Sequence, residues 1–308
     1  MIWPFDTGGV VLALYVVTFA LHAVFVSYVL AGTAYVLVRK DDAATAIVRD
    51  RLPFMLGCGI TAGVAPLLFI QLLYQRRFYT ANLLLGPRWG AVVPALIVGF
   101  YALYLAKSSP KWSRIALVTA LGCFAFVAWS WTEIHQLMMT DSVWREFYAV
   151  EKRLFLDPDI APRLVLWFGA MTTLFATVAA WSADARRLAI VALAGRVVSA
   201  AGAAWLVSRG FTAQGPAVAW LIVLALAVAA EVVGWLLVLR DRSIGIAIAT
   251  AGCTAALLSA TVIREAPRLA MILPAPEGGG GIVFAVVFVT AGVAIAWVVK
   301  TVRAAPPT

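Results

Sequence analysis

The stretch VVLALYVVTFALHAVFVSYVLAGTAYVL, residues 10–37, decides the fold of this protein. It contains no Asp, Glu, Lys or Arg, and His22 is its one side chain that titrates near neutral pH. The hydrocarbon core of a bilayer is about 30 Å thick, and a helix needs about 20 apolar residues to cross it. The stretch is long enough for this, so it predicts a transmembrane helix.

Eight further apolar runs follow, so we expect an all-α, polytopic transmembrane bundle of about nine spans in one integral membrane domain, residues 1–308. The runs lie at 54–74, 90–106, 113–136, 163–181, 188–207, 216–239, 244–263 and 281–299. The composition agrees, because 63% of the residues are hydrophobic and 13% are charged, whereas about a quarter of the residues of soluble domains are charged. The chain therefore requires a lipid bilayer as its solvent.

The net charge of +9 indicates membrane topology rather than a nucleic-acid partner, because the basic residues stand in ones and twos between apolar runs. With nine spans, thirteen basic residues fall on one side and ten on the other, which favours the N-terminus outside and the C-terminus inside. The three cysteines form no CxxC or CxxCH, so the chain carries no motif for zinc, an iron–sulfur cluster or covalent haem attachment.

Two long loops are expected on the outer side. Residues 138–162 predict a surface helix with Trp144, Phe147 and Tyr148 at the membrane interface, and residues 264–280 form the second loop. We find no internal sequence repeat.

The two histidines, His22 and His135, lie in or at the end of predicted spans. Counted from Arg39 and Arg114 at the inner edge, they lie about 25 Å and about 31 Å away at 1.5 Å per residue, in the outer half of the bilayer. A neutral imidazole is an axial ligand of haem iron, and Met138 and Met139 beside His135 offer thioethers. The alternative is a hydrogen bond to a neighbouring helix.

Arg196 and Glu231 are charged residues inside consecutive predicted spans. Each lies nine residues from an inner-edge arginine, which corresponds to a depth of about 13 Å. Equal depth on consecutive helices predicts an ion pair. Such a pair has either a structural role or a role in proton or quinone traffic at the inner side.

The segment GCGITAGVAPLLFIQLLYQRRFYTANLL, residues 57–84, combines small, polar and basic residues. Its first glycines, Gly57, Gly59 and Gly63, permit close helix packing or leave room for a flat cofactor. Arg76 and Arg77 at its outer end are suited to haem propionates, or alternatively to lipid headgroups.

Three of these segments together resemble cytochrome bd oxidase subunit I. FALHAVFVSYVLAGTAYVL is similar to that family's first helix, with His22 matching a haem-ligating histidine. GITAGVAPLLFIQLLYQRRFYTANLL is similar to its second helix, and WSWTEIHQLM to its fourth. The resemblance covers roughly residues 10–140. It implies haem-binding helices in residues 1–140, and residues 141–308 are expected to contribute further helices that could form a quinone side.

The chain departs from this family in ways that argue against a complete oxygen reductase. Gln71 stands where a glutamate is expected, the run 163–181 has no histidine, and a long quinol-binding loop is missing. The resemblance therefore implies a reduced module of the bacterial inner membrane with one or two haems b. It would pass electrons between quinone and a c-type cytochrome or other respiratory subunit. A small-solute transporter and a cofactor-free membrane anchor are the alternatives.

Overall fold

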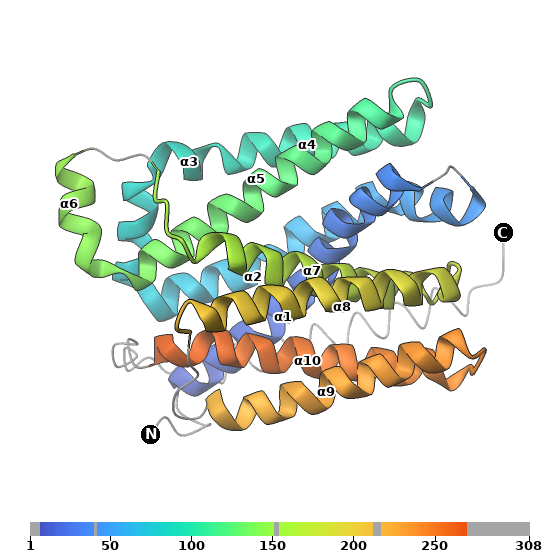
Figure 1. Cartoon of the computed structure of the whole chain (residues 1–308). Coiled ribbons are helices and arrows are strands. Elements are labelled where there is room, and N and C mark those ends of the chain that lie inside the picture. The colour runs from blue at the N-terminus through green and yellow to red at the C-terminus, as the bar shows by residue number, and fades with distance from the viewer. Residues whose placement is uncertain (1–6, 40–41, 151–153, 212–216, 270–308) are drawn as a thin grey trace.

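The computed structural model describes residues 7–39, 42–150, 154–211 and 217–269, and within these ranges it contains helices and no strand (Figure 1). The helices are α1 (Thr7–Val38), α2 (Ala43–Leu84), α3 (Gly86–Gly90), α4 (Val92–Ser108), α5 (Ser113–Met139), the 3₁₀ turn η1 (Asp141–Val143), α6 (Trp144–Ala149), α7 (Ile160–Ala179), α8 (Ala185–Ser208), α9 (Ala217–Leu239) and α10 (Ile244–Leu269).

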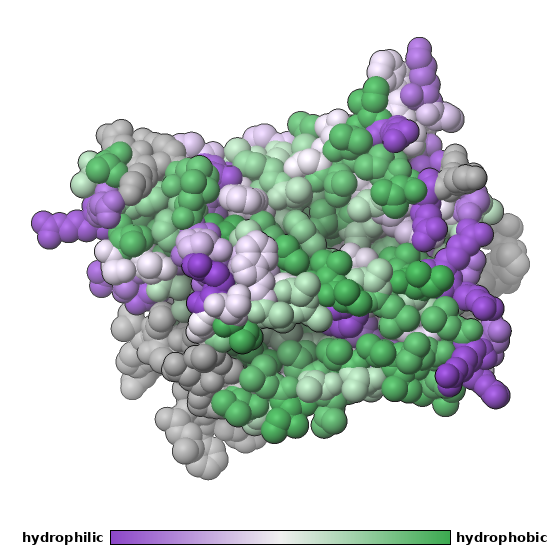
Figure 2. Space-filling model, viewed as in Figure 1, coloured by the Kyte–Doolittle hydropathy of each residue, from purple (hydrophilic) through white to green (hydrophobic). Residues whose placement is uncertain are grey.

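Eight segments of the described chain are long and apolar enough to cross a membrane, which confirms a polytopic helical bundle. They correspond to the first eight predicted runs, and the ninth, 281–299, lies outside the described residues. The third predicted run, 90–106, is longer in the structure, because α3 and α4 follow each other directly and together span Gly86–Ser108. Figure 2 shows the consequence on one face, a hydrophobic belt between two hydrophilic ends.

The helix α2 is about twice as long as its predicted run. Its 42 residues correspond to about 63 Å of helix, so it projects beyond the apolar belt. At its start, the Asp42 carboxylate accepts a hydrogen bond from the Thr45 backbone N–H at 2.8 Å. This N-cap, together with the Arg187 side chain, lowers the pKa of Asp42 to about 2. The helical dihedral angles are interrupted at Tyr74, with φ −121° and ψ 16°, and not at the inserted Pro66.

Consecutive spans pack as antiparallel hairpins, α1/α2, α4/α5, α7/α8 and α9/α10. The helix α1 also contacts α5, α7 and α10, so it lies at the centre of the bundle (Figure 1). The turns of the four hairpins lie at one end of the molecule. We call it the basic end, because these turns and their flanks carry Arg39, Lys107, Lys111, Arg114, Arg186, Arg187, Arg240 and Arg242. The orientation of this end relative to the cell stays a prediction.

Two hairpins, α7/α8 and α9/α10, share a glycine packing pattern that sequence analysis did not detect. In each hairpin, one glycine of the first helix packs on the backbone of the second helix. Two glycines of the second helix, seven residues apart, pack on the backbone of the first. These glycines are Gly169 in α7 with Gly195 and Gly202 in α8, and Gly234 in α9 with Gly245 and Gly252 in α10. A Cβ atom at any of these positions would overlap backbone atoms of the neighbouring helix. Small residues thus let these helices touch backbone to backbone.

The structure corrects both outer loops. In the first, Phe147 is buried in a hydrophobic cluster instead of facing the interface, while Tyr148 is exposed. Trp144 is tied to the bundle by a hydrogen bond from its Nε1 to the Leu137 carbonyl at 2.7 Å. In the second, α10 continues to Leu269, so Arg264 and Glu265 are buried helix residues rather than loop residues.

Candidate functional site

His22 lies in the seam between α1 and α2. Its Nδ1 is 2.9 Å from the carbonyl oxygen of Gly59. Because a carbonyl only accepts, Nδ1 carries the proton and donates, which leaves the lone pair on Nε2. No described residue bonds to Nε2. A Cβ at Gly63 would lie 2.8 Å from the ring carbon Cε1, so the slot for the ring requires glycine there.

His135 is engaged differently, although it too was a predicted haem ligand. It is buried in α5, and the Nε of Arg264 in α10 donates to its Nε2 at 3.2 Å. In this arrangement the lone pair that would reach a metal is occupied by a guanidinium proton. His22 is therefore the histidine whose Nε2 is available in the described structure.

Arg264 is the centre of a buried polar cluster that the sequence analysis missed. Its guanidinium carbon lies 4.7 Å from the ring centroid of Phe19 and 5.8 Å from that of Trp167. Such stacking stabilises a cation that is only 10% exposed. Sequence analysis had counted Arg264 among the outer-side basic residues, and the signal that was overlooked is the pair Arg264–Glu265 directly after an apolar run.

Glu265 completes this cluster beside Arg264. The hydroxyls of Tyr15 and Tyr74 donate to its carboxylate at 3.3 Å and 2.8 Å, and the Arg264 Nε lies 3.8 Å away. We call these groups the Glu265 cluster, which comprises Tyr15, Phe19, Tyr74, His135, Trp167, Arg264 and Glu265. It joins α1, α2, α5, α7 and α10. Since Phe19 precedes His22 by one helical turn, the cluster lies close to His22 along α1.

Arg77, a predicted propionate ligand, is occupied by protein groups. It donates to the Met138 carbonyl at 3.0 Å and to the Asp141 carboxylate at 2.6 Å, and it stacks over Trp144. The neighbouring Arg76 is exposed and lines a surface pocket of about 300 Å³. Among the described residues Arg76 has no hydrogen bond or ion pair, so it is the arginine of this pair that could meet an anionic group.

The other predicted contact residues occupy ordinary positions in the bundle. The Gln71 side chain is half-buried and accepts a hydrogen bond from the Tyr79 hydroxyl at 3.3 Å. Met138 packs in the hydrophobic core, and Met139 is half-buried. Met138 and Met139 follow His135 by three and four residues and hence share its side of α5.

The predicted ion pair between Arg196 and Glu231 is confirmed, linking α8 to α9. Glu231 is fully buried and also accepts from the Trp235 Nε1 at 3.4 Å. A buried carboxylate with a short guanidinium contact is electrostatically compensated. This geometry fits the structural alternative, since Glu231 is fully buried and both of its carboxylate oxygens contact protein groups.

A second buried pair, Glu133 with Arg88, was also missed. The Glu133 Oε2 lies 2.8 Å from the Arg88 Nε, and its Oε1 accepts from the Phe155 backbone N–H at 2.5 Å. Arg88 had been assigned to the outer surface. The contact with Arg88 ties α3 to α5, and the contact with Phe155 ties the segment before α7 to α5.

The described residues contain no group of three His, Cys, Asp or Glu side chains that would hold a metal ion by themselves. A porphyrin iron needs only axial ligands from the protein, so His22 alone suffices for one such bond. Comparison with models of known families and with curated proteins gives no match. The resemblance to cytochrome bd oxidase subunit I stays a prediction from the segments quoted above.

Proposed function

We propose that this chain is a haem b electron-transfer subunit of a bacterial inner-membrane respiratory complex, with His22 as an axial ligand. The observation that carries the proposal is the orientation of the His22 ring. A metal-bound histidine usually donates its second ring N–H to a carboxylate or a backbone carbonyl, which fixes its tautomer. His22 makes this contact with Gly59, and its Nε2 remains available.

Two further features around His22 fit a haem, namely the slot beside Gly63 that holds the ring and the apolar bundle that surrounds it. Gly63 leaves the imidazole in a slot without a side chain above it, so the ring is held by packing as well as by its hydrogen bond. When bound, haem b supplies a one-electron redox centre. The chain holds that centre in an apolar bundle, where burial and hydrogen bonding to the ligand tune its potential.

In this proposal the electron partners are a quinone within the bilayer and a c-type cytochrome at the surface. The Glu265 cluster supports the quinone assignment, because oxidation of a quinol releases two protons for every two electrons. Glu265, held by two phenol hydroxyls, and His135 are groups that can exchange protons close to His22. The Arg196–Glu231 pair acts as a helix clamp instead.

The experiment is an absorption spectrum and a pyridine haemochrome assay on protein purified from a haem-replete bacterial host. We expect roughly one haem b per chain, and loss of at least about nine-tenths of it in His22→Ala, since that substitution removes the iron–nitrogen bond. His135→Gln is the matched control, and it should retain the haem.

Two results would contradict this function. The first is a colourless, monodisperse wild-type protein from cells making ample porphyrin. The second is a His22→Ala variant with the wild-type Soret band, which would remove His22 from the ligand set.

A further inference from the structure

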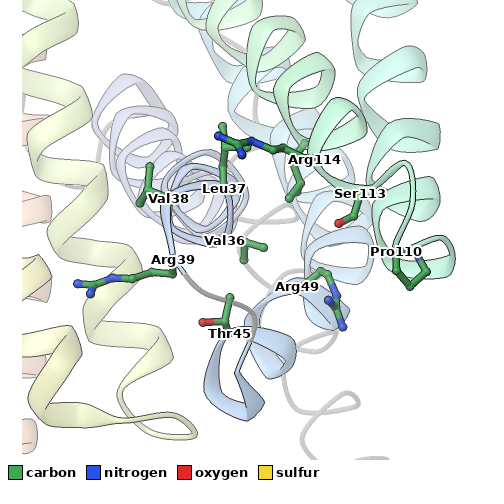
Figure 3. Close-up of a pocket in the computed structure, with 10 residues that line it drawn as sticks. Val36, Leu37, Val38, Arg39, Thr45, Arg49, Pro110, Ser113 and Arg114 are labelled. Carbon is green, nitrogen blue, oxygen red and sulfur yellow. The ribbon is translucent and has the colours of Figure 1, made fainter.

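A pocket of about 380 Å³ opens at the basic end, between the α1–α2 connection and the α4–α5 turn (Figure 3). One part of its lining is apolar, and includes Val36, Leu37, Val38, Pro110 and Leu117. The other part is basic or hydroxylic, and includes Arg39, Thr45, Arg49, Ser113 and Arg114. None of the ten lining residues is acidic, so the pocket is amphipathic and positively charged.

Two of its arginines differ from Arg186 and Arg187 at the same end. Arg186 lies 3.6 Å from Asp241, and Arg187 lies 2.5 Å from Asp42, so both are neutralised. Within the described chain, Arg39 and Arg114 have no carboxylate partner. Figure 3 shows Arg114 reaching from α5 over the end of α1, while Arg39 extends outward at the rim. Their charges are available to an anion from outside the protein.

Thr45 supplies an independent sign of a missing ligand. It is 2% exposed and lines the pocket, yet its hydroxyl oxygen has no hydrogen-bond partner. The Thr45 side chain lies beside the Asp42 carboxylate, which accepts a hydrogen bond from the Thr45 backbone N–H. A buried hydroxyl left unsatisfied is unfavourable, and an acceptor atom in the pocket would satisfy it.

The first turn of α5 adds donors on the opposite wall. Ser113 begins this helix, and no side chain caps it. The first N–H groups of a helix lack intrahelical partners and favour anions. Ser113 and Arg114, both lining residues, stand in this first turn.

The depth of the pocket indicates what kind of anion it receives. The transmembrane segment of α1 ends at Val38, which is 77% exposed, and Arg39 follows it directly. Basic residues at the end of a span lie at the level of the lipid headgroups. A ligand here meets cations and hydroxyls on one side and apolar side chains on the other.

We propose that this pocket binds an anionic phospholipid, whose headgroup lies at the mouth of the pocket and is attracted by the charges of Arg39 and Arg114, with the Thr45 hydroxyl as a further donor. The acyl chains would follow the apolar wall into the bilayer. Basic pockets between transmembrane helices recognise lipid headgroups by this combination of charge and depth. The site is separate from His22 and does not depend on haem binding.

The test is native mass spectrometry of the full-length protein in detergent with added dioleoyl phosphatidylglycerol, compared with dioleoyl phosphatidylcholine. We expect one tightly retained phosphatidylglycerol per chain. The variant R39Q/R114Q should bind it about thirtyfold more weakly, since each arginine contributes about fivefold. Thr45→Val should lower binding about fivefold, because it removes one hydrogen bond.

The matched control is R186Q/R242Q, which removes two charges from the same end outside the pocket and should bind within about twofold of wild type. Equal losses in R39Q/R114Q and this control would overturn the proposal. Full displacement of the lipid by millimolar inorganic phosphate would also overturn it, in favour of a soluble phosphate ligand. If R39Q/R114Q is not monodisperse, Thr45→Val decides, and its retention of wild-type affinity would sink the site.

Discussion

The hairpins α1/α2 and α9/α10 both rely on glycine, but for different contacts. In α9/α10 a Cβ at Gly234 would overlap the backbone of α10 around Ala249, so the two main chains touch. In α1/α2 a Cβ at Gly63 would meet the imidazole of His22 at 2.8 Å, and the two main chains do not touch there. One glycine joins two helices, and the other makes room for the His22 side chain.

This difference teaches how to interpret glycine in a membrane helix. Backbone contact between helices gains dispersion and weak hydrogen bonds over many atoms, so such glycines serve stability. A glycine facing a polar ring instead sets the position of that ring. Gly57 lies in the same helix as Gly63, and no neighbouring atom of the described residues lies within 4 Å of its ideal Cβ. It therefore serves neither purpose and is an internal control.

The largest expected effect tests the backbone contact. Gly234→Leu should destabilise the protein by roughly 3 kcal/mol or more, because the side chain has only main-chain atoms to displace. Gly57→Leu should stay within about 1 kcal/mol of wild type, since it faces open space. Unfolding in mixed micelles, followed by circular dichroism, gives both values. Equal stability of the two variants would mean that α9 and α10 are not in backbone contact.

An intermediate effect tests the slot for the ring. Gly63→Ala should be about 1 kcal/mol less stable than Gly57→Ala, because the methyl group displaces His22 and weakens its hydrogen bond to Gly59. The same unfolding assay measures the difference, and the imidazole ¹⁵N shifts of labelled protein report the hydrogen bond directly. Unchanged shifts in Gly63→Ala would show that the ring is not held by this seam.

The smallest effect concerns a link from the α1/α2 hairpin to the α7/α8 hairpin, where Asp42 at the start of α2 pairs with Arg187 of α8. The N-cap and this pair lower the pKa of Asp42 from 3.8 to about 2, so its contribution to stability is present above about pH 4 and is lost as the pH falls toward 2. The melting temperature of Asp42→Asn should thus lie below wild type at pH 6 and approach it at pH 3. A gap that is the same at both pH values would argue against the link.

Sequence analysis predicted where the candidate residues lie along their helices better than it predicted which residues they contact. Apolar length identified the spans, and equal depth predicted the pair of Arg196 with Glu231, because both follow from distance along one helix. Position in or at the end of predicted spans singled out His22 and His135, and the resemblance added a match for His22. The analysis missed Arg264, Glu265 and the Glu133–Arg88 pair, because these residues stand at the ends of apolar runs, where a loop and a buried helix end have the same composition.

The amino-acid sequence alone determined that the chain crosses a bilayer repeatedly, because twenty apolar residues match the hydrocarbon thickness whatever surrounds them. Only the tertiary structure decided which groups meet: Gly63 with His22, Arg264 with His135, and two tyrosines with Glu265. The physical reason is that hydropathy and depth describe position along a helix axis. The rotation of each helix about that axis, and the choice of its neighbours, arise from packing among all of them.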